Sequence, residues 1–255
     1  LGELSKLAGA PVSRIVRLEA LAERVTREGV TATSFAPAFE AALVAETATA
    51  VGLKSIIAYR FGLDFDPTPP SVEEVERQVG TWLRTIEKTG ATRLVDPVLL
   101  RHVLWTGART GLPIQIHSGY GDTDLDLHRA DPLLMTGFLR ATENVCPILL
   151  LHNYPFHRNA GYLAQMFRHV YLDVGLAVSY SGAQSGQVIA ESLELAPFTK
   201  VLFSSDAWGA PELHLLGSWL FRRGMARVIG GWVASGDWAP ADAERMIRLI
   251  PAENA

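Results

Sequence analysis

The sequence of 255 residues predicts an α/β fold built on a parallel β-sheet. Short apolar runs alternate along the chain with helix-like stretches, which is the pattern of repeated strand–helix units. Several of the runs are almost continuously apolar, notably Cys-Pro-Ile-Leu-Leu-Leu-His at residues 146–152. Such runs are typical of parallel strands that are buried on both faces. The pattern alone leaves two architectures open, a doubly wound sheet and a barrel.

Helix-start signals separate the apolar runs. Asp96–Pro97 and Asp131–Pro132 pair an N-cap side chain with a proline in the first helical turn. The amphipathic stretch Val72–Glu87 and the segment Pro240–Ile250 also predict helices. No repeat or linker divides the chain, so we expect one domain over residues 1–255. The expected strands are the six apolar runs Ser13–Glu19, Lys54–Arg60, Pro113–His117, Pro147–His152, Val170–Val174 and Lys200–Ser205.

Composition narrows the class of partner. Hydrophobic residues make up 48% and charged residues 20% of the chain, an ordinary balance for a globular domain. The formal net charge of −4 gives no basic footprint for nucleic acid, and no apolar run approaches the roughly 18–20 residues of a membrane span. The single cysteine, Cys146, cannot form an internal disulfide, which fits a reducing compartment. We therefore expect a cytoplasmic protein that acts on a small molecule.

Three apolar strands end in residues that can bind a metal ion. His117 and His152 end two of the runs, and Asp206 follows a third. In parallel α/β folds ligands bind outside the carboxyl ends of the strands. Each residue alone could be a structural histidine or a turn-capping aspartate, but the threefold coincidence predicts a joint metal or acid–base site. Histidine nitrogen and carboxylate oxygen suit zinc, with manganese and iron as alternatives.

Residues on a fourth strand are candidates for binding the substrate. Tyr59 and Arg60 close the run Lys54–Arg60 and are expected at the same rim. An arginine there suits a carboxylate substrate, although a surface ion pair is the alternative. Lys54 begins that run, so we expect it at the opposite end of the strand and assign it no role in the site.

Histidines and an arginine in the segments after the strands complete the set. His102 and His169 are expected to be structural, because one lies within a helix and the other precedes a strand at its amino end. The remaining candidates for contact with substrate are His128, Arg129, His157 and His214.

Four segments in this order resemble the amidohydrolase-related family, close to the barrel half of fungal proteins that are fused to glutamine-synthetase-like domains. They cover residues 117–132, 149–164, 170–176 and 204–214, and include His-Ser-Gly-Tyr-Gly-Asp and Ser-Ser-Asp-Ala. The resemblance implies a (β/α)₈ barrel in which histidines end strands five and six and an aspartate ends strand eight. It thereby places His117, His152 and Asp206 on those strands, with Ser13–Glu19 as strand three and Lys54–Arg60 as strand four.

The family's remaining metal ligands are a His-x-His pair on the first strand, and no such pair occurs in this chain. We therefore expect an incomplete barrel with strands three to eight, truncated at its N-terminus, either as a natural truncation or as a fragment of a longer protein. Strands three and eight would each lack a neighbour on one side. Such a fragment is expected to be poorly soluble or homo-oligomeric and to bind zinc weakly.

The function that the resemblance implies is metal-assisted hydrolysis. The substrate would be a small, carboxylate-bearing molecule with an amide or related C–N or C–O bond. Asp206 would move the proton, His117 would bind the metal, and His152 would be a second ligand or a hydrogen-bond donor. The alternatives are a decarboxylase or lyase of the same family and a non-catalytic barrel that serves as a remnant or an interaction module. A nucleotide-binding fold is disfavoured, because no Gly-x-Gly-x-x-Gly follows a strand.

Overall fold

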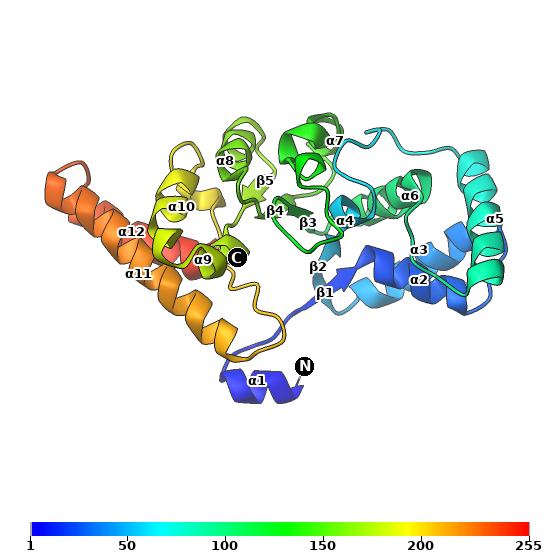
Figure 1. The fold of residues 1–255 in the computed structure, drawn as a ribbon, viewed down its shortest axis with the longest axis horizontal. Coiled ribbons are helices and arrows are strands. Elements are labelled where there is room, and N and C mark those ends of the chain that lie inside the picture. Colours follow the sequence, from blue (N-terminus) through cyan, green and yellow to red (C-terminus); the bar gives the residue numbers. More distant parts are fainter. Residues whose placement is uncertain (1, 255) are drawn as a thin grey trace.

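A parallel five-stranded sheet forms the centre of the chain (Figure 1). The structure, a computed structural model, describes residues 2–254. The strand order is β1-β2-β3-β4-β5, and every neighbouring pair is parallel. The α/β class with a parallel sheet is therefore confirmed. The strands are β1 Arg14–Arg17, β2 Ala50–Ser55, β3 Ile114–Ser118, β4 Ile148–His152 and β5 Val170–Leu172.

Helices connect the strands, because successive parallel strands need a crossover connection. Asp96 begins α6 as predicted, because its side chain accepts hydrogen bonds from the backbone N–H groups of Val98 and Leu99. The twelve α-helices are α1 Gly2–Ala8, α2 Leu18–Arg27, α3 Phe35–Thr47, α4 Ile57–Arg60, α5 Val72–Thr89, α6 Pro97–Ala108, α7 Thr136–Thr142, α8 His157–Met166, α9 Gly175–Ser181, α10 Ser185–Ser192, α11 Glu212–Ser235 and α12 Pro240–Arg248 within residues 2–254. The shorter helical turns are η1 Leu127–Arg129, η2 Pro132–Met135, η3 Gly182–Gln184, η4 Phe198–Lys200 and η5 Leu249–Glu253.

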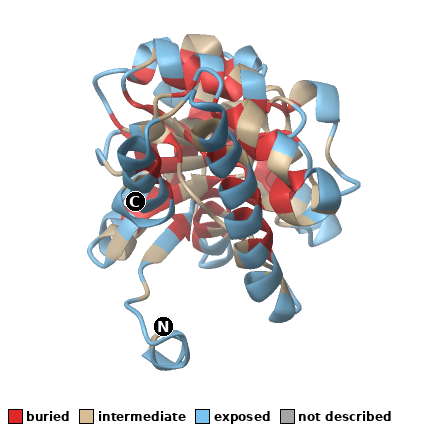
Figure 2. Cartoon of the chain, turned by 90° about the vertical axis from the view of Figure 1, so that its left-hand side faces the viewer, coloured by how far each residue is buried: buried red, intermediate tan, exposed pale blue. Residues whose placement is uncertain are grey.

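The two faces of the sheet differ in burial. One register row, Leu53, Ile114, Ile148 and Val170, is fully buried beneath the helices. The adjacent row on the other face runs Arg17, Lys54, Gln115, Leu149 and Tyr171, and its members are half-buried or exposed. Figure 2 shows the buried residues gathered inside the helical layer. The core therefore lies between the sheet and the helices, and the second face stays partly open.

Two predicted strand boundaries are wrong. The strand expected over Lys54–Arg60 is Ala50–Ser55, and Tyr59 and Arg60 belong to the short helix α4. A short apolar run does not distinguish a strand from a helix, and here polar contacts turn the chain. The buried Glu19 carboxylate accepts from Ser55 Oγ at 2.6 Å and from the Ile56 N–H at 2.9 Å. Lys54 therefore lies near the carboxyl end of β2, not at its start.

Glu19 itself marks the second boundary error. The strand expected over Ser13–Glu19 ends at Arg17, and Leu18 and Glu19 open α2.

The segment Lys200–Ser205 forms much less of a strand than expected. Only Val201 pairs with the sheet, through an isolated parallel bridge to Leu172. At the opposite edge of the sheet, β1 pairs with β2 alone within residues 2–254, so the sheet is open beside β1.

No helix in the described part of the chain is both long enough and apolar enough to cross a membrane.

Candidate active site

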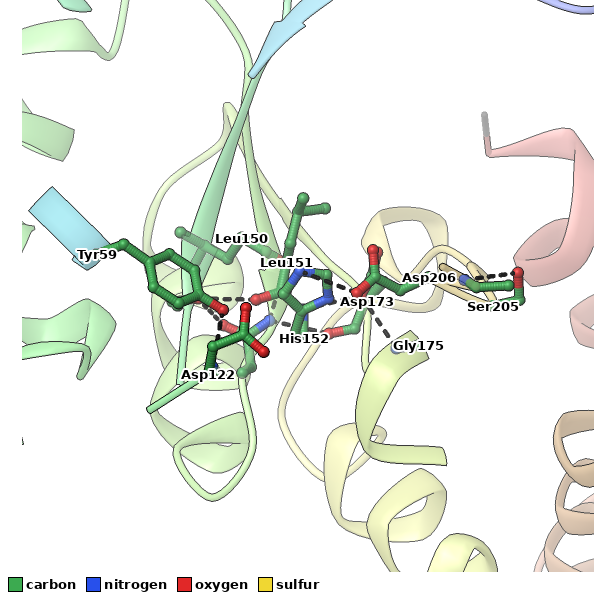
Figure 3. A network of polar contacts seen from close by, with 12 residues as sticks. Tyr59, Asp122, Leu150, Leu151, His152, Asp173, Gly175, Ser205 and Asp206 are labelled. Carbon is green, nitrogen blue, oxygen red and sulfur yellow. Dashed lines mark hydrogen bonds and ion pairs between the residues drawn. The ribbon is translucent and has the colours of Figure 1, made fainter. Parts of the chain in front are cut away.

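His117, His152 and Asp206 lie together at the carboxyl end of the sheet. His117 is in β3 and His152 is the last residue of β4, and their ring centroids are 4.8 Å apart. His152 Nε2 is 3.6 Å from Asp206 Oδ2. Figure 3 shows the His152 ring between Tyr59 on one side and Asp173 and Asp206 on the other. Because parallel strands end at one edge, three distant segments deliver these side chains to one place.

The backbone around these residues is held in an uncommon conformation. His152, Asn153 and Asp206 have φ angles of 70°, 61° and 44°. Non-glycine residues in this left-handed region cost about 1–3 kcal/mol each and cluster at functional sites. The buried Asp173 carboxylate accepts from the His152 N–H at 2.9 Å and from the Gly175 N–H at 3.1 Å. Asp173 therefore fixes where the β4 strand turns and how His152 is presented.

Burial sets the protonation of the two histidines. Removal from water, together with the neighbouring His152 and Lys54, lowers the pKa of His117 to about 2. Burial, together with Lys54, lowers the pKa of His152 to about 3. Both imidazoles are thus neutral near pH 7. His117 Nε2 and His152 Nδ1 are buried without a hydrogen-bond partner in the structure.

Asp206 is shifted in the opposite direction. Burial raises the pKa of its carboxyl to about 6, with Lys54 opposing the rise and Asp173 adding to it. A carboxylate with this pKa can both accept and release a proton near neutral pH. The cluster therefore places a neutral histidine pair beside a group suited to proton transfer.

A cavity of about 890 Å³ opens over this cluster. Its size suits a small molecule. The cavity is lined by Arg17, Lys54, Ile56, Tyr59, Arg60, Arg93, His117, Tyr120, Gly121, Asp122, Thr123, Asp124, His152, Leu176, Ser179, Tyr180, Ser205, Asp206, Ala207, Trp208 and Leu213.

Tyr59 and Arg60 both line the cavity, reaching it from α4. The Tyr59 ring centroid is 4.3 Å from that of His117, and its hydroxyl accepts from the Asp122 N–H at 3.3 Å. Burial raises the pKa of Tyr59 to about 12, so the phenol stays protonated. Tyr59 therefore presents a neutral hydroxyl beside His117.

His128 and Arg129 lie outside the residues that line the cavity. His128 is exposed on η1. Arg129 Nη2 pairs with Asp64 Oδ1 at 2.6 Å, and its guanidinium lies 4.5 Å from the centroid of the Phe61 ring. Arg129 thus ties its loop to the segment after α4.

His157 and His214 also lie outside the lining. His157 is buried at the start of α8, with Nε2 2.6 Å from Glu191 Oε2. His214 lies on α11, with Nδ1 3.5 Å from the hydroxyl of Ser205 at the cavity edge. Among the three candidate histidines and Arg129, His214 is the one with a polar contact to a residue that lines the cavity.

Sequence reasoning missed three residues of the site. Arg17 and Lys54 line the cavity as register partners at the ends of β1 and β2, and the misplaced strand boundary hid Lys54. Asp173 directly follows the apolar run of β5. That position is equivalent to the one that drew attention to Asp206, but the expected strand Val170–Val174 ran past Asp173 because the apolar Val174 follows it.

The donor atoms fit a divalent cation in type but not in arrangement. Neutral imidazoles with unpaired nitrogens beside a carboxylate are the ligands that zinc takes. Among residues 2–254, however, no three His, Cys, Asp or Glu side chains form a group close enough to hold an ion. The described residues therefore supply only part of a metal site.

Comparison with known proteins defines the class. An amidohydrolase family model matches residues 15–250. The chain therefore belongs to the amidohydrolase family, and the resemblance seen in the sequence is confirmed. It is 31% identical over 267 residues to protein fluG of Emericella nidulans, a match that covers 91% of this chain. The chain spans 30% of the length of that relative.

Solved structures agree with the family and the fold. A protein of Lactobacillus casei, provisionally described as a metal-dependent hydrolase, is 34% identical with a TM-score of 0.86, over 98% of this chain and 66% of that one. Uronate isomerase of Thermotoga maritima has a TM-score of 0.59 at 16% identity, over 93% of this chain and 56% of that one, and shows a shared fold alone.

Proposed function

We propose that the protein is a metal-dependent hydrolase that cleaves an amide or related C–N or C–O bond of a small, carboxylate-bearing molecule. The observation that carries the proposal is the cluster of His117, His152 and Asp206 at the floor of a cavity of about 890 Å³. Membership of the amidohydrolase family supports the hydrolytic class. The substrate and the bond are our own inference.

The chain's own residues supply proton transfer and positioning. Asp206, with a pKa of about 6, takes the proton of the attacking water and passes it to the leaving group. His152 lies 3.6 Å from Asp206 and is positioned to contact the oxygen on which charge develops. Asp173 holds the backbone of His152 through the 2.9 Å hydrogen bond.

A divalent metal, when bound, lowers the pKa of water toward about 7 and polarises the substrate carbonyl. His117 Nε2 and the Asp206 carboxylate are the ligands that this chain would contribute, with His152 as a further donor. Zinc is the proposed ion, because neutral imidazole and carboxylate suit it.

The test is Asp206→Asn in the full-length protein. We expect turnover of an N-acyl amino acid or related carboxylate to fall about 10²–10⁴-fold, because the proton-transfer group is lost. Asp242→Asn, a change at an exposed position on α12, is the matched control. A variant at position 206 with near-normal turnover would remove Asp206 from the mechanism. Product analysis separates hydrolysis from decarboxylation, which would release carbon dioxide.

One observation favours a second candidate, a barrel without catalysis. The described residues form no three-ligand metal group. Metal content of the full-length protein distinguishes the two. Stoichiometric metal that is lost in His117→Ala supports the enzyme, whereas a metal-free protein that stays inactive when zinc is added supports the interaction module.

A further inference from the structure

The cavity is divided into two chemically different halves. The histidine pair and Asp206 occupy the side formed by β3, β4 and the segment after Val201. The other side lies over β1 and β2, and the basic lining residues Arg17, Lys54, Arg60 and Arg93 gather there. The acidic lining residues Asp122 and Asp124 come from the segment after β3, and Asp124 pairs with Arg93. The order of the strands produces this division, because β1 and β2 stand beside β3 on the side away from β4.

Arg60 is the buried centre of the basic half. Only 7% of its side chain is exposed, although it lines the cavity. Its Nη2 lies 3.2 Å from Glu23 Oε1, whereas Nε and Nη1 are buried without a hydrogen-bond partner. Buried guanidinium donors are costly to leave unpaired, so their partner is expected to be a ligand.

Neighbouring charges leave the basic half with an excess of positive charge. Arg93 is neutralised by Asp124 at 2.7 Å, and Arg60 faces Glu23. Arg17 and Lys54 have no ion-pair partner among residues 2–254. As register partners in parallel strands, they present their side chains on the same face of the sheet.

We propose that Arg60, Arg17 and Lys54 form an anion subsite that holds the carboxylate of the substrate. Neighbouring strands lie about 4.8 Å apart, so the carboxylate binds roughly 5–10 Å from the histidine pair, or one to two strand spacings. The substrate class is thereby narrowed to short molecules with the carboxylate a few bonds from the bond that is cleaved. This inference rests on the proposed function only in taking the cavity as the substrate site.

The test measures anion binding without turnover. Thermal unfolding of the full-length protein is followed with increasing acetate, benzoate, neutral benzamide or inorganic phosphate at constant ionic strength, because a ligand of the folded state raises Tm by mass action. Neutral 1,10-phenanthroline keeps the protein free of metal, so an anion cannot bind through an ion. The variants are Arg60→Gln and Arg17→Gln. Arg101→Gln is the matched control, because Arg101 is equally buried at 8% exposure and pairs with Asp66 outside the cavity.

Acetate and benzoate are expected to raise Tm saturably in the wild type and in Arg101→Gln, whereas benzamide does not. Benzoate should bind at least about tenfold more weakly to Arg60→Gln, as expected when a buried charged partner is lost. Arg17→Gln should weaken benzoate binding several-fold. Because Arg17 is exposed, this variant tests the subsite even if Arg60→Gln does not fold.

Several results would overturn the subsite. They are equal effects of benzoate and benzamide, no response to either carboxylate, unchanged affinity in the arginine variants, or a preference for phosphate. Since no metal and no reaction are involved, the subsite can stand if Asp206→Asn disproves the hydrolase, and it can fall while the hydrolase stands.

Discussion

At the scale of single residues, burial controls the chemistry of the histidine pair. His117 and His152 are 3% and 2% exposed, and each has a ring nitrogen without a partner. A protonated imidazole in this environment would be a poorly solvated charge beside a second histidine and Lys54. The pair is thus available as neutral donors at the pH at which most enzymes work.

We expect the folded protein to lose stability in acid because of the buried histidines His117 and His152. The pKa of His117 is about 2 and that of His152 about 3, both below the ordinary 6.5, so the unfolded chain binds protons first. The stability that the neutral pair contributes is full above pH 6.5 and is lost as the pH falls toward the folded values. Asp206 acts oppositely, since its pKa is raised from 3.8 to about 6. Its contribution is full below pH 3.8 and is lost as the pH rises through about 6.

Urea unfolding of the metal-free protein over this range measures the effect. We expect His117→Asn to flatten the acid loss of the free energy of unfolding, whereas His128→Asn, at an exposed position on η1, should keep the wild-type slope. Equal slopes in all three proteins would mean that His117 is protonated with equal ease in the folded and unfolded states.

At the scale of elements, polar contacts at the ends of strands decide where chain segments stop. The runs Pro113–His117 and Pro147–His152 predicted β3 and β4 closely, because both are apolar runs with a clear polar end. The end of β2 was not predictable in this way, since the apolar run continues from β2 into α4. The Glu19 carboxylate that turns the chain comes from 36 residues away in sequence. Long-range contacts of this kind leave no local signal.

The same contrast between local signals and long-range contacts explains which site residues could be predicted from the sequence. His117 and His152 could be located from strand ends alone. Lys54 could not, because its position depends on the misread boundary of β2. The low exposure of Arg60 and its contact with Glu23 depend on packing between α4 and α2, which no single segment reveals.

The N-cap of α6 gives a test at this scale. The Asp96 carboxylate accepts from Val98 N–H at 2.9 Å and from Leu99 N–H at 3.0 Å. We expect Asp96→Ala to lower the free energy of unfolding by about 1 kcal/mol, because two helix-end donors lose their partner. Asp96→Asn retains an acceptor and should stay close to the wild type. Equal losses in the two variants would point to charge, not capping, as the source of stability.

At the scale of the whole molecule, the open edge of the sheet is the dominant feature. β1 has a hydrogen-bonding partner on one side only within residues 2–254, and Ile15 on this strand is 37% exposed. Unpaired strand edges with apolar side chains invite pairing with another chain. The edge thus predicts self-association of the described chain.

Sedimentation velocity over a range of concentrations tests this prediction. We expect the 255-residue chain to associate as its concentration rises and Ile15→Lys to shift it toward the monomer, because a charge on an edge strand opposes pairing. Val44→Lys makes the same change on the helix α3, where Val44 is 64% exposed and belongs to no strand, and should leave association unchanged. A wild-type chain that stays monomeric throughout would exclude association through β1.

The division of the cavity between strands has a consequence for how this protein can diverge. Arg17 and Lys54 stand on β1 and β2, whereas His117 and His152 stand on β3 and β4. A substitution at either basic position changes the charge that a ligand meets and keeps the histidine side chains and the Asp173 carboxylate that holds His152. Loss of Lys54 also removes a charge that lowers the pKa of both histidines. Descendants of one ancestor could therefore exchange an acidic substrate for a neutral one through two surface-accessible positions and inherit the reacting groups intact.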